Sequence, residues 1–392
     1  MRHDHLLVRS AIALLTGLCL TGAQAGSRVW SFGVGTHLAQ GESASETQRL
    51  LLRLGPAEPG LRDEAYWSDI ERVPGELRES RNFEKLRQVM CDSPRAGASV
   101  LVLGYGNPAY DDGGRPTSDA AIAAYTRYAR FVVSRCPNVG FVEVWNEWNL
   151  TTGAGMKRAG PGTPEAYFRL HVAVARALRE DGYRGRILAG AVGGDRPDWR
   201  FTRRLLELGI GAYADGYSIH LYNFALRSKG GIGEFRTRVT ALDQLLSASR
   251  DASQLPIYVT EYGWPTGGSD IELAPAAAAR ELLDTSLMLM SMPRVAGAWI
   301  YELLDRGDRA AGVESNFGLF RRDGSGKPTH CVARWLGTLA SQRAEVRALG
   351  APAGSGYLIR TGDRTTTIVL DPTAAEDGAR RRALDAITTC DN

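Results

Sequence analysis

Eight short apolar segments, separated by longer stretches with helical spacing, constrain the fold of this chain more than any other feature. Each segment has the length of a buried strand. Eight strands that alternate with helices are the number required to close a (β/α)8 barrel. We therefore predict an α/β protein with a (β/α)8 TIM barrel, whose strands lie near residues Trp30–Thr36, Gly60–Ala65, Ser99–Gly104, Gly140–Asn146, Arg186–Ala191, Gly216–His220, Pro256–Glu261 and Val295–Tyr301.

The intervening stretches predict helices. The clearest are Ala120–Cys136, Pro164–Glu180 and Ala274–Met290. In the second of these, apolar residues recur on one helical face. In the third, Pro275 lies near the first turn, where proline is well tolerated.

The chain is longer than a barrel requires. A chain of 392 residues has room for a barrel of about 250 residues and one further element. From about Glu345 the alternation stops, and the stretch GYLIRTGDRTTTIVLD predicts two short strands around Gly362-Asp363. This piece is too small to have a core of its own. We therefore predict a leader at residues 1–25, the barrel at 26–344 and a small C-terminal β appendage at 345–392.

The N-terminus has the pattern of a secretory signal peptide. Arg2 and Arg9 flank a short positive region, the apolar run Ala11–Leu20 follows, and an A-x-A cleavage pattern ends at Ala25. The run is too short to span a bilayer, and no later stretch is apolar enough to do so. We expect cleavage after Ala25 and a periplasmic or secreted location.

Four cysteines follow the predicted leader: Cys91, Cys136, Cys331 and Cys390. An even number in an oxidising compartment favours two disulfides, for which three connectivities exist. Cys91 and Cys136 follow predicted helices and precede the third and fourth strands, and such αβ loops meet at one end of a barrel. We predict that these two pair, and that Cys331 and Cys390 tie the appendage to the last helix.

Charge and motifs exclude several classes of function. A formal net charge of +3 is too small to indicate nucleic-acid or membrane-surface binding. The stretch GVGTHLAQG lacks the glycine spacing and the Lys-Ser/Thr of a phosphate-binding loop. The sequence contains no recognisable metal, nucleotide or flavin motif, so we predict neither a cofactor nor a metal.

Two glutamates occupy matching positions at the ends of two apolar strands. Glu147 follows the apolar run in VEVWNEWNL, and Glu261 ends the run in LPIYVTEYGWPTGG. These are the fourth and seventh strands, whose C-terminal ends face the same mouth of a closed barrel. Two carboxylates at such a mouth are what glycoside hydrolysis needs, since one protonates the leaving oxygen and the other attacks the sugar or activates water.

A single glutamate at a strand end is more often a cap or an ion-pair partner than a catalytic group. The matched pair favours catalysis, because each lies beside aromatic residues whose faces pack on sugars and whose polar tips bond hydroxyls. Glu143 lies deeper on the strand face of Glu147, and we expect it to be a satisfied interior polar residue.

These two sites resemble the clan of retaining (β/α)8-barrel glycosidases. The resemblance rests on Asn146-Glu147 and on the segment EYGW that begins at Glu261. The stretches FGVGTHLAQG and GLRDEAYWSDIE further resemble the first two strands of glycoside hydrolase family 39, and the likeness extends from about Trp30 to Trp335. It is nearest to bacterial glycosidases associated with exopolysaccharide synthesis. The β-xylosidases and α-L-iduronidases of that family usually carry a larger β-sandwich, for which this chain has no room.

The resemblance implies roles for individual residues. Glu147 would be the acid/base and Glu261 the nucleophile, and Asn146 would bond the sugar 2-hydroxyl. Because Glu147 must first be protonated, we expect its pKa to be raised by the indoles and by Glu261. The residues that would bind substrate are His37, Arg62, Asn146, His220, Tyr222 and Trp299, with Arg62 and Tyr222 beside the nucleophile.

Structural alternatives exist for several of these residues. His37 and His220 are alternatively buried core histidines, and Arg62-Asp63 a structural ion pair. Trp299 is either the floor of a sugar subsite or an ordinary indole of the barrel interior. Further aromatic residues are candidates for outer subsites, namely Tyr66, Trp67, Trp148 and Trp264.

The leading prediction is a secreted, retaining β-glycosidase that hydrolyses a polysaccharide by double displacement. Long βα loops with several aromatics suggest a groove, and hence endo action. The resemblance to exopolysaccharide-associated glycosidases implies that the substrate is a bacterial exopolysaccharide. One alternative is an exo-acting, β-xylosidase-like enzyme, which a pocket closed at one end would favour. Another is a non-catalytic carbohydrate-binding factor of exopolysaccharide assembly, which the loss of either glutamate would have indicated; both are present.

Overall fold

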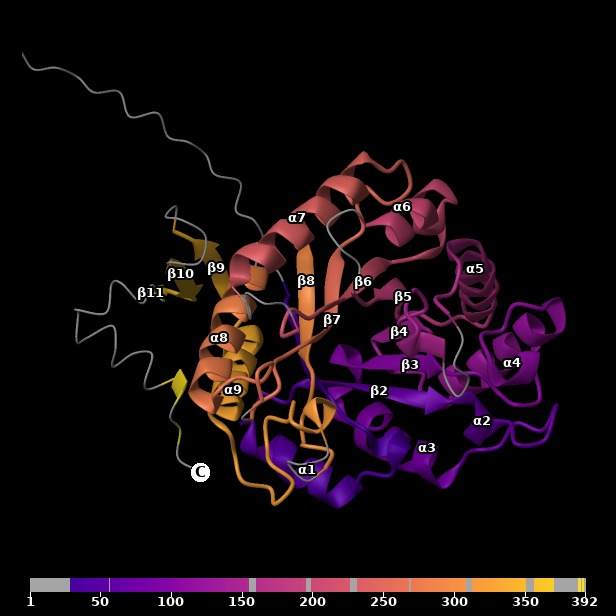
Figure 1. Ribbon diagram of the computed structural model, residues 1–392, viewed down its shortest axis with the longest axis horizontal. Coiled ribbons are helices and arrows are strands. Elements are labelled where there is room, and N and C mark those ends of the chain that lie inside the picture. The colour runs from indigo at the N-terminus through magenta and orange to yellow at the C-terminus, as the bar shows by residue number, and fades with distance from the viewer. Residues whose placement is uncertain are drawn as a thin grey trace, which may run out of the picture.

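The computed structural model describes residues 29–55, 57–154, 160–194, 199–225, 231–267, 269–307, 312–349 and 356–369, together with 387, 388 and 390. The predicted leader lies outside these residues. Eight parallel strands form a closed barrel in which each strand pairs with the next and β8 pairs with β1 (Figure 1). They are β1 (Ser31–Gly35), β2 (Gly60–Tyr66), β3 (Val100–Gly104), β4 (Phe141–Val144), β5 (Arg186–Val192), β6 (Gly216–Leu221), β7 (Ile257–Tyr262) and β8 (Val295–Ile300).

Helices connect the strands and cover the outside of the barrel (Figure 1). Within the described ranges none is long and apolar enough to cross a membrane. The α-helices are α1 (Ala44–Arg53), α2 (Trp67–Ile70), α3 (Arg81–Leu86), α4 (Asp119–Arg135), α5 (Pro164–Glu180), α6 (Arg200–Glu207), α7 (Ile232–Ala248), α8 (Pro275–Ser291) and α9 (Pro328–Ser341). Shorter turns include η1 (Leu38–Gln40), the π-helical η2 (Arg87–Cys91), η3 (Pro94–Ala98), η4 (Asp111–Gly113), η5 (Thr152–Ala154), η6 (Ile210–Tyr213) and η8 (Val313–Ser315).

The barrel confirms the fold class and the eight strands predicted from the sequence. All five residues of β3 are buried, as expected when helices cover one face of a parallel sheet and side chains fill the other. The longest helices begin where their sequences predict. Ser118 and Thr163 cap α4 and α5 through their side chains, and Pro275 lies in the first turn of α8.

A small antiparallel sheet follows the barrel. It contains β9 (Glu345–Ala348), β10 (Gly356–Thr361) and β11 (Arg364–Val369), with β10 in the middle. The two strands predicted around Gly362-Asp363 are confirmed as β10 and β11. The sequence did not reveal β9, which is only four residues long. Alternate residues such as Tyr357 and Ile359 are buried, and the sheet lies beside α8 (Figure 1).

The structure confirms both predicted disulfides. Cys91, at the end of η2, pairs with Cys136, which follows α4, with the Cα atoms 5.1 Å apart. Cys331 in α9 pairs with Cys390, with a Cα distance of 5.5 Å. The first bridge joins two neighbouring αβ connections, and the second fixes the C-terminal end of the chain to the last barrel helix.

Candidate active site

A cavity of about 470 Å³ opens at the C-terminal ends of the barrel strands. This is the end at which barrel enzymes carry their sites, and the volume lies in the usual range for small-molecule pockets. Both predicted catalytic glutamates line it. The lining residues also include His37, Gln40, Arg62, Asp63, Glu64, Tyr66, Tyr105, Asn146, Leu150, Thr152, Tyr222, Phe224, Tyr301, Arg306, Glu314 and Phe317.

Glu147 is held in place by an unusual backbone path. The strand β4 ends at Val144 because Trp145 and Glu147 adopt positive φ angles of 71° and 45°. Such angles are uncommon for residues with a side chain and concentrate at functional sites. The amide of Glu147 donates to the carbonyl of Ala191, which follows Gly190 in β5, at 3.0 Å. The turn thus directs the carboxylate into the cavity.

The carboxylate of Glu147 is packed closely. Thr152 Oγ1 donates to Oε2 at 2.6 Å, and His220 Nδ1 lies 3.0 Å from Oε1. A Cβ atom on Gly193 would lie only 2.1 Å from Glu147 Oε1. Glycine at position 193 therefore leaves the space that this carboxylate occupies.

Glu261 is the penultimate residue of β7 and also lines the cavity. Tyr222 donates a hydrogen bond to its Oε2 at 2.7 Å, as predicted from the sequence, and Arg62 Nη1 lies 2.5 Å from its Oε1. Burial, followed by the charge of Glu261, raises the pKa of Tyr222 well above its usual value, so its hydroxyl remains a donor. Glu261 is 8% exposed, and each of its two oxygens accepts a hydrogen bond from one of these two donors.

Arg62 is buried and binds three side chains from outside its own strand, instead of pairing with the adjacent Asp63. Its guanidinium donates to Glu143 Oε2 at 2.9 Å, to Glu261, and to Asn146 Oδ1 at 2.8 Å. Burial opposes its charge, yet Glu143 and Glu261 together raise the pKa of Arg62 above the normal arginine value. Glu143 is fully buried and paired, which agrees with the interior role predicted for it. The alternative Arg62-Asp63 pair does not form.

Asp63 has a separate structural role. Its Oδ2 accepts hydrogen bonds from Thr36 Oγ1 at 2.7 Å and from the amide of Leu38 at 2.8 Å, so it ties the end of β1 to β2. Burial raises the pKa of Asp63 to about 8 despite these donors.

His220 connects the two glutamates. Its Nδ1 lies 3.0 Å from Glu147 Oε1 and 3.5 Å from Glu261 Oε2. One oxygen of each carboxylate and this nitrogen all lie within 4.8 Å of one another. Burial disfavours the imidazolium, but the charge of Glu261 and the hydrogen bond to Glu147 raise the pKa of His220 above its ordinary value.

The pKa of Glu147 departs from the expectation based on the sequence. Burial does raise it, but the hydrogen bond and charge of His220, together with Thr152, lower the pKa of Glu147 below its ordinary value. The prediction of a raised pKa for Glu147 was wrong. It rested on the neighbouring indoles and on Glu261, and it left out the imidazole of His220, which lies between the two carboxylates. In the free site the shared proton therefore favours His220.

His37 also lines the cavity. It is 8% exposed, its Nε2 bonds the carboxyl of the buried Glu302, and its Nδ1 lies 3.1 Å from Gln40 Nε2. Burial and the charges of Arg306 and Arg62 lower the pKa of His37 to about 3. His37 is therefore a neutral imidazole that lines the cavity, with its ring oriented by hydrogen bonds on both sides.

The subsite role predicted for Trp299 is wrong. Its side chain is fully buried among Val100, Phe141 and Tyr258, and its indole N–H donates to the carbonyl of Ala98 at 3.1 Å. The barrel register explains this position. Trp299 pairs with Gly33, which pairs with Gly60, the first residue of β2, so the indole lies at the N-terminal end of the barrel. Tyr301, two residues later, lines the cavity instead.

Other aromatic residues also differ from the expectation. Trp67, Trp148 and Trp264 are buried, with exposed fractions of 0–4%, and only Tyr66 of the four candidate outer subsites lines the cavity. The sequence reasoning missed Tyr105. Tyr105 comes directly after β3, and Asn146 comes two residues after the last residue of β4. A polar side chain just after a buried strand was the signal in the sequence that could have identified Tyr105.

The donor set of the site does not favour a metal ion. Glu147, His220 and Glu261 offer three close ligand atoms. However, Arg62 and Tyr222 already donate to Glu261, and the guanidinium charge opposes a second cation there. A second group, His330 with Cys331 and Cys390, has its sulfurs in a disulfide and so lacks the thiolates that a metal binds.

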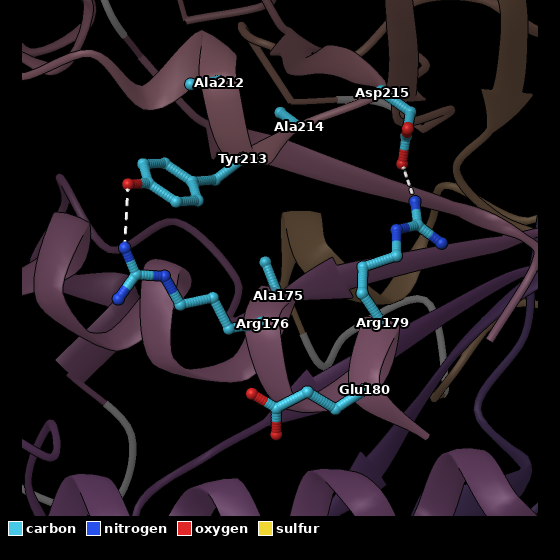
Figure 2. Close-up of a pocket in the computed structure, with 8 residues that line it drawn as sticks. All are labelled: Ala175, Arg176, Arg179, Glu180, Ala212, Tyr213, Ala214 and Asp215. Atoms are coloured by element: carbon cyan, nitrogen blue, oxygen red, sulfur yellow. Dashed lines mark hydrogen bonds and ion pairs between the residues drawn. The ribbon is translucent and has the colours of Figure 1, made fainter. Parts of the chain in front are cut away.

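A smaller hollow of about 290 Å³ lies between α5 and η6 (Figure 2). Arg176 donates to the Tyr213 hydroxyl at 3.1 Å, and Arg179 pairs with Asp215. Asp215 immediately precedes β6, so this hollow lies at the opposite end of the barrel from the glutamates. Its charged groups tie α5 to the start of β6, which indicates a structural role.

Known structures share this architecture. No known protein-family profile and no curated protein matches the sequence. A family 39 glycoside hydrolase from Bacteroides cellulosilyticus WH2 matches with a TM-score of 0.68 and 21% identity, over 88% of this chain and 71% of that chain. The GH39 enzyme from Xanthomonas axonopodis pv. citri has a TM-score of 0.62 and 19% identity, over 87% of this chain and 71% of that chain.

A GH39 β-xylosidase from Caulobacter crescentus gives a TM-score of 0.62 at 19% identity, over 88% of this chain and 78% of that chain. At such identities the likeness establishes the fold alone. The chain is therefore a (β/α)8-barrel protein that shares its architecture with family 39 glycoside hydrolases.

Proposed function

We propose that the protein is a retaining β-glycosidase, with Glu261 as the nucleophile and Glu147 as the acid/base. The observation that carries this proposal is the approach of the two carboxylates, whose nearest oxygens lie within 4.8 Å of each other across the cavity. Retaining enzymes hold their carboxyl groups about 5–5.5 Å apart, whereas inverting enzymes need about 6.5–9.5 Å for an intervening water. Nearest oxygens this close leave little room for a water between the two carboxylates, which supports double displacement.

In the first step, the carboxylate of Glu261 attacks the anomeric carbon and the bond to the leaving oxygen breaks. Arg62 and Tyr222 each donate a hydrogen bond to one oxygen of Glu261 and so orient the carboxylate. The leaving oxygen takes a proton from Glu147. Since His220 Nδ1 lies 3.0 Å from Glu147 Oε1, the proton held by the imidazole can pass directly to the acid.

In the second step, Glu147 is ionised and accepts a proton from water, which attacks the anomeric carbon and releases Glu261. Asn146 precedes Glu147 in the chain and lines the same cavity as both glutamates, and Arg62 orients its amide. We propose that it bonds the sugar 2-hydroxyl, a contact that strengthens in the transition state.

For the substrate, we propose a polysaccharide cut within its chain, with a bacterial exopolysaccharide as the preferred class, and a periplasmic or secreted location. The two disulfides support an oxidising compartment. The burial of three of the four candidate outer aromatics weakens the case for a long groove. It leaves exo action as a second candidate, which the likeness to the Caulobacter β-xylosidase favours. Product profiles distinguish the two, since endo action gives oligosaccharides first and exo action gives monosaccharides.

The stereochemistry of hydrolysis tests the mechanism. We expect the first product released from a β-glycoside to be the β-anomer, because two inversions at the anomeric carbon restore its configuration. Proton NMR of the anomeric signal during the first minutes of the reaction measures this directly. Initial release of the α-anomer would instead require a single displacement by water.

Replacement of Gly193 by alanine tests the placement of Glu147. The new Cβ would meet Glu147 Oε1 at 2.1 Å, so the carboxylate must leave its present position. A shift of about 1 Å at a reacting group can lower the rate about a hundredfold, and we expect such a loss in kcat/KM. Gly233→Ala is the control, since its Cβ meets nothing within 4 Å. Equal activity in the two variants would contradict this account of Glu147.

A further inference from the structure

Two tyrosines bind the same carboxylate at the edge of the cavity. Glu64, near the end of β2, accepts a hydrogen bond from Tyr66 at 2.7 Å on Oε2 and from Tyr105 at 2.9 Å on Oε1. Neither these tyrosines nor Glu64 has a role in the two catalytic steps proposed for Glu147 and Glu261. The three side chains are half-buried and line the cavity.

Tyr105 extends this contact to the catalytic centre. Its hydroxyl hydrogen points to Glu64, so its oxygen is available as an acceptor, and Asn146 Nδ2 donates to it at 2.8 Å. On the other side, Arg62 Nη2 donates to Asn146 Oδ1 at 2.8 Å. Because a guanidinium has only donors, the amide oxygen must face Arg62 and the amide nitrogen must face Tyr105.

We propose that Glu64 and Tyr105 are positioning residues that fix the orientation of the Asn146 amide, so that its second N–H points at the sugar 2-hydroxyl. This inference rests on the proposed function. Glu64 sets the direction of the Tyr105 hydroxyl, the hydroxyl accepts one N–H of Asn146, and the remaining N–H is held for the substrate. Burial, followed by the charge of Glu64, raises the pKa of Tyr105 well above its normal value, so the phenol keeps the proton that this arrangement needs.

The chain offers a matched pair of variants. Tyr105→Phe and Tyr66→Phe each remove one hydroxyl from one oxygen of Glu64, but only Tyr105→Phe takes the acceptor away from Asn146. Tyr105→Phe keeps the aromatic ring that packs against Trp145 and Tyr66. Each variant is assayed on an activated aryl β-glycoside that the wild type hydrolyses and on the 2-deoxy form of the same glycoside.

With Tyr105→Phe we expect kcat/KM to fall about tenfold more on the 2-hydroxy substrate than on the 2-deoxy substrate, which corresponds to about 1.4 kcal/mol. With Tyr66→Phe we expect kcat/KM to change by the same factor on the 2-hydroxy and the 2-deoxy substrate. In an Asn146→Ala background, Tyr105→Phe should lose its selectivity, since the residue through which it acts is absent. If Tyr105→Phe does not fold, Glu64→Leu, which removes both acceptor oxygens, should give a selective loss in the same direction.

An equal loss on both substrates, or selectivity that persists without Asn146, would overturn the positioning role and leave the glycosidase proposal intact. A wild-type protein that releases no aryl group from any glycoside in a broad panel would instead overturn the proposed function, and the positioning role with it.

Discussion

Glu261→Ala is expected to lower kcat on the order of 10⁴-fold or more, whatever the leaving group. The variant lacks the atom that forms the glycosyl-enzyme, and a better leaving group cannot replace a nucleophile. The cavity left by the side chain lies beside Arg62 and Tyr222, so a small anion can enter it. Added azide should therefore attack from that side in a single displacement and give an α-glycosyl azide from a β-glycoside.

The measurement is turnover of aryl glycosides with leaving groups of different acidity, followed by identification of the azide product. Glu143→Gln is a less suitable comparison because Glu143 is a fully buried partner of Arg62, and its effect would mix stability with activity. Thermal melting should show that Glu261→Ala is folded. Wild-type-like rates in a folded Glu261→Ala protein would remove Glu261 from the mechanism.

Glu147→Ala is expected to show the second largest effect, and one that depends on the substrate. Natural glycosides and aryl glycosides with poor leaving groups should lose activity about 10²- to 10⁴-fold, the usual contribution of a general acid or base. An aryl glycoside whose leaving group needs no proton should still form the glycosyl-enzyme. The second step then stalls, because no base activates water.

Azide distinguishes this variant from the first. It needs no general base, so it should restore the second step of Glu147→Ala and give a β-glycosyl azide. Finding the α-azide with Glu147→Ala and the β-azide with Glu261→Ala would show that the two roles are reversed.

The positions of the strands and the two glutamates were predictable because their signals are local. Each strand is a short apolar run with turn residues on both sides, and Glu147 and Glu261 each stand where such a run ends. Barrel closure then places these ends around one mouth without further information. The cysteine pairing followed from the same topology, since Cys91 and Cys136 lie in neighbouring connections.

Features that depend on three-dimensional register were not predictable in the same way. Trp299 was misplaced because the staggered pairing of β8, β1 and β2 decides which layer of the barrel interior a residue occupies. The pKa direction of Glu147 was misjudged because it depends on His220, 73 residues away in sequence, whose ring nitrogen lies 3.0 Å from the carboxylate. The four-residue strand β9 is visible only through its pairing with β10.

The buried group formed by Arg62, Glu143, Glu147, His220 and Glu261 has a consequence for how charge is handled during turnover. When the glycosyl-enzyme forms, one proton leaves the group with the departing alcohol and one carboxylate becomes a neutral ester. The net charge of the group is therefore the same before and after this step. Arg62 still faces the carboxylate of Glu143, and Thr152 still donates to the carboxylate of Glu147 after His220 has given up its proton. The low-dielectric interior can then host both states without the entry of a counterion.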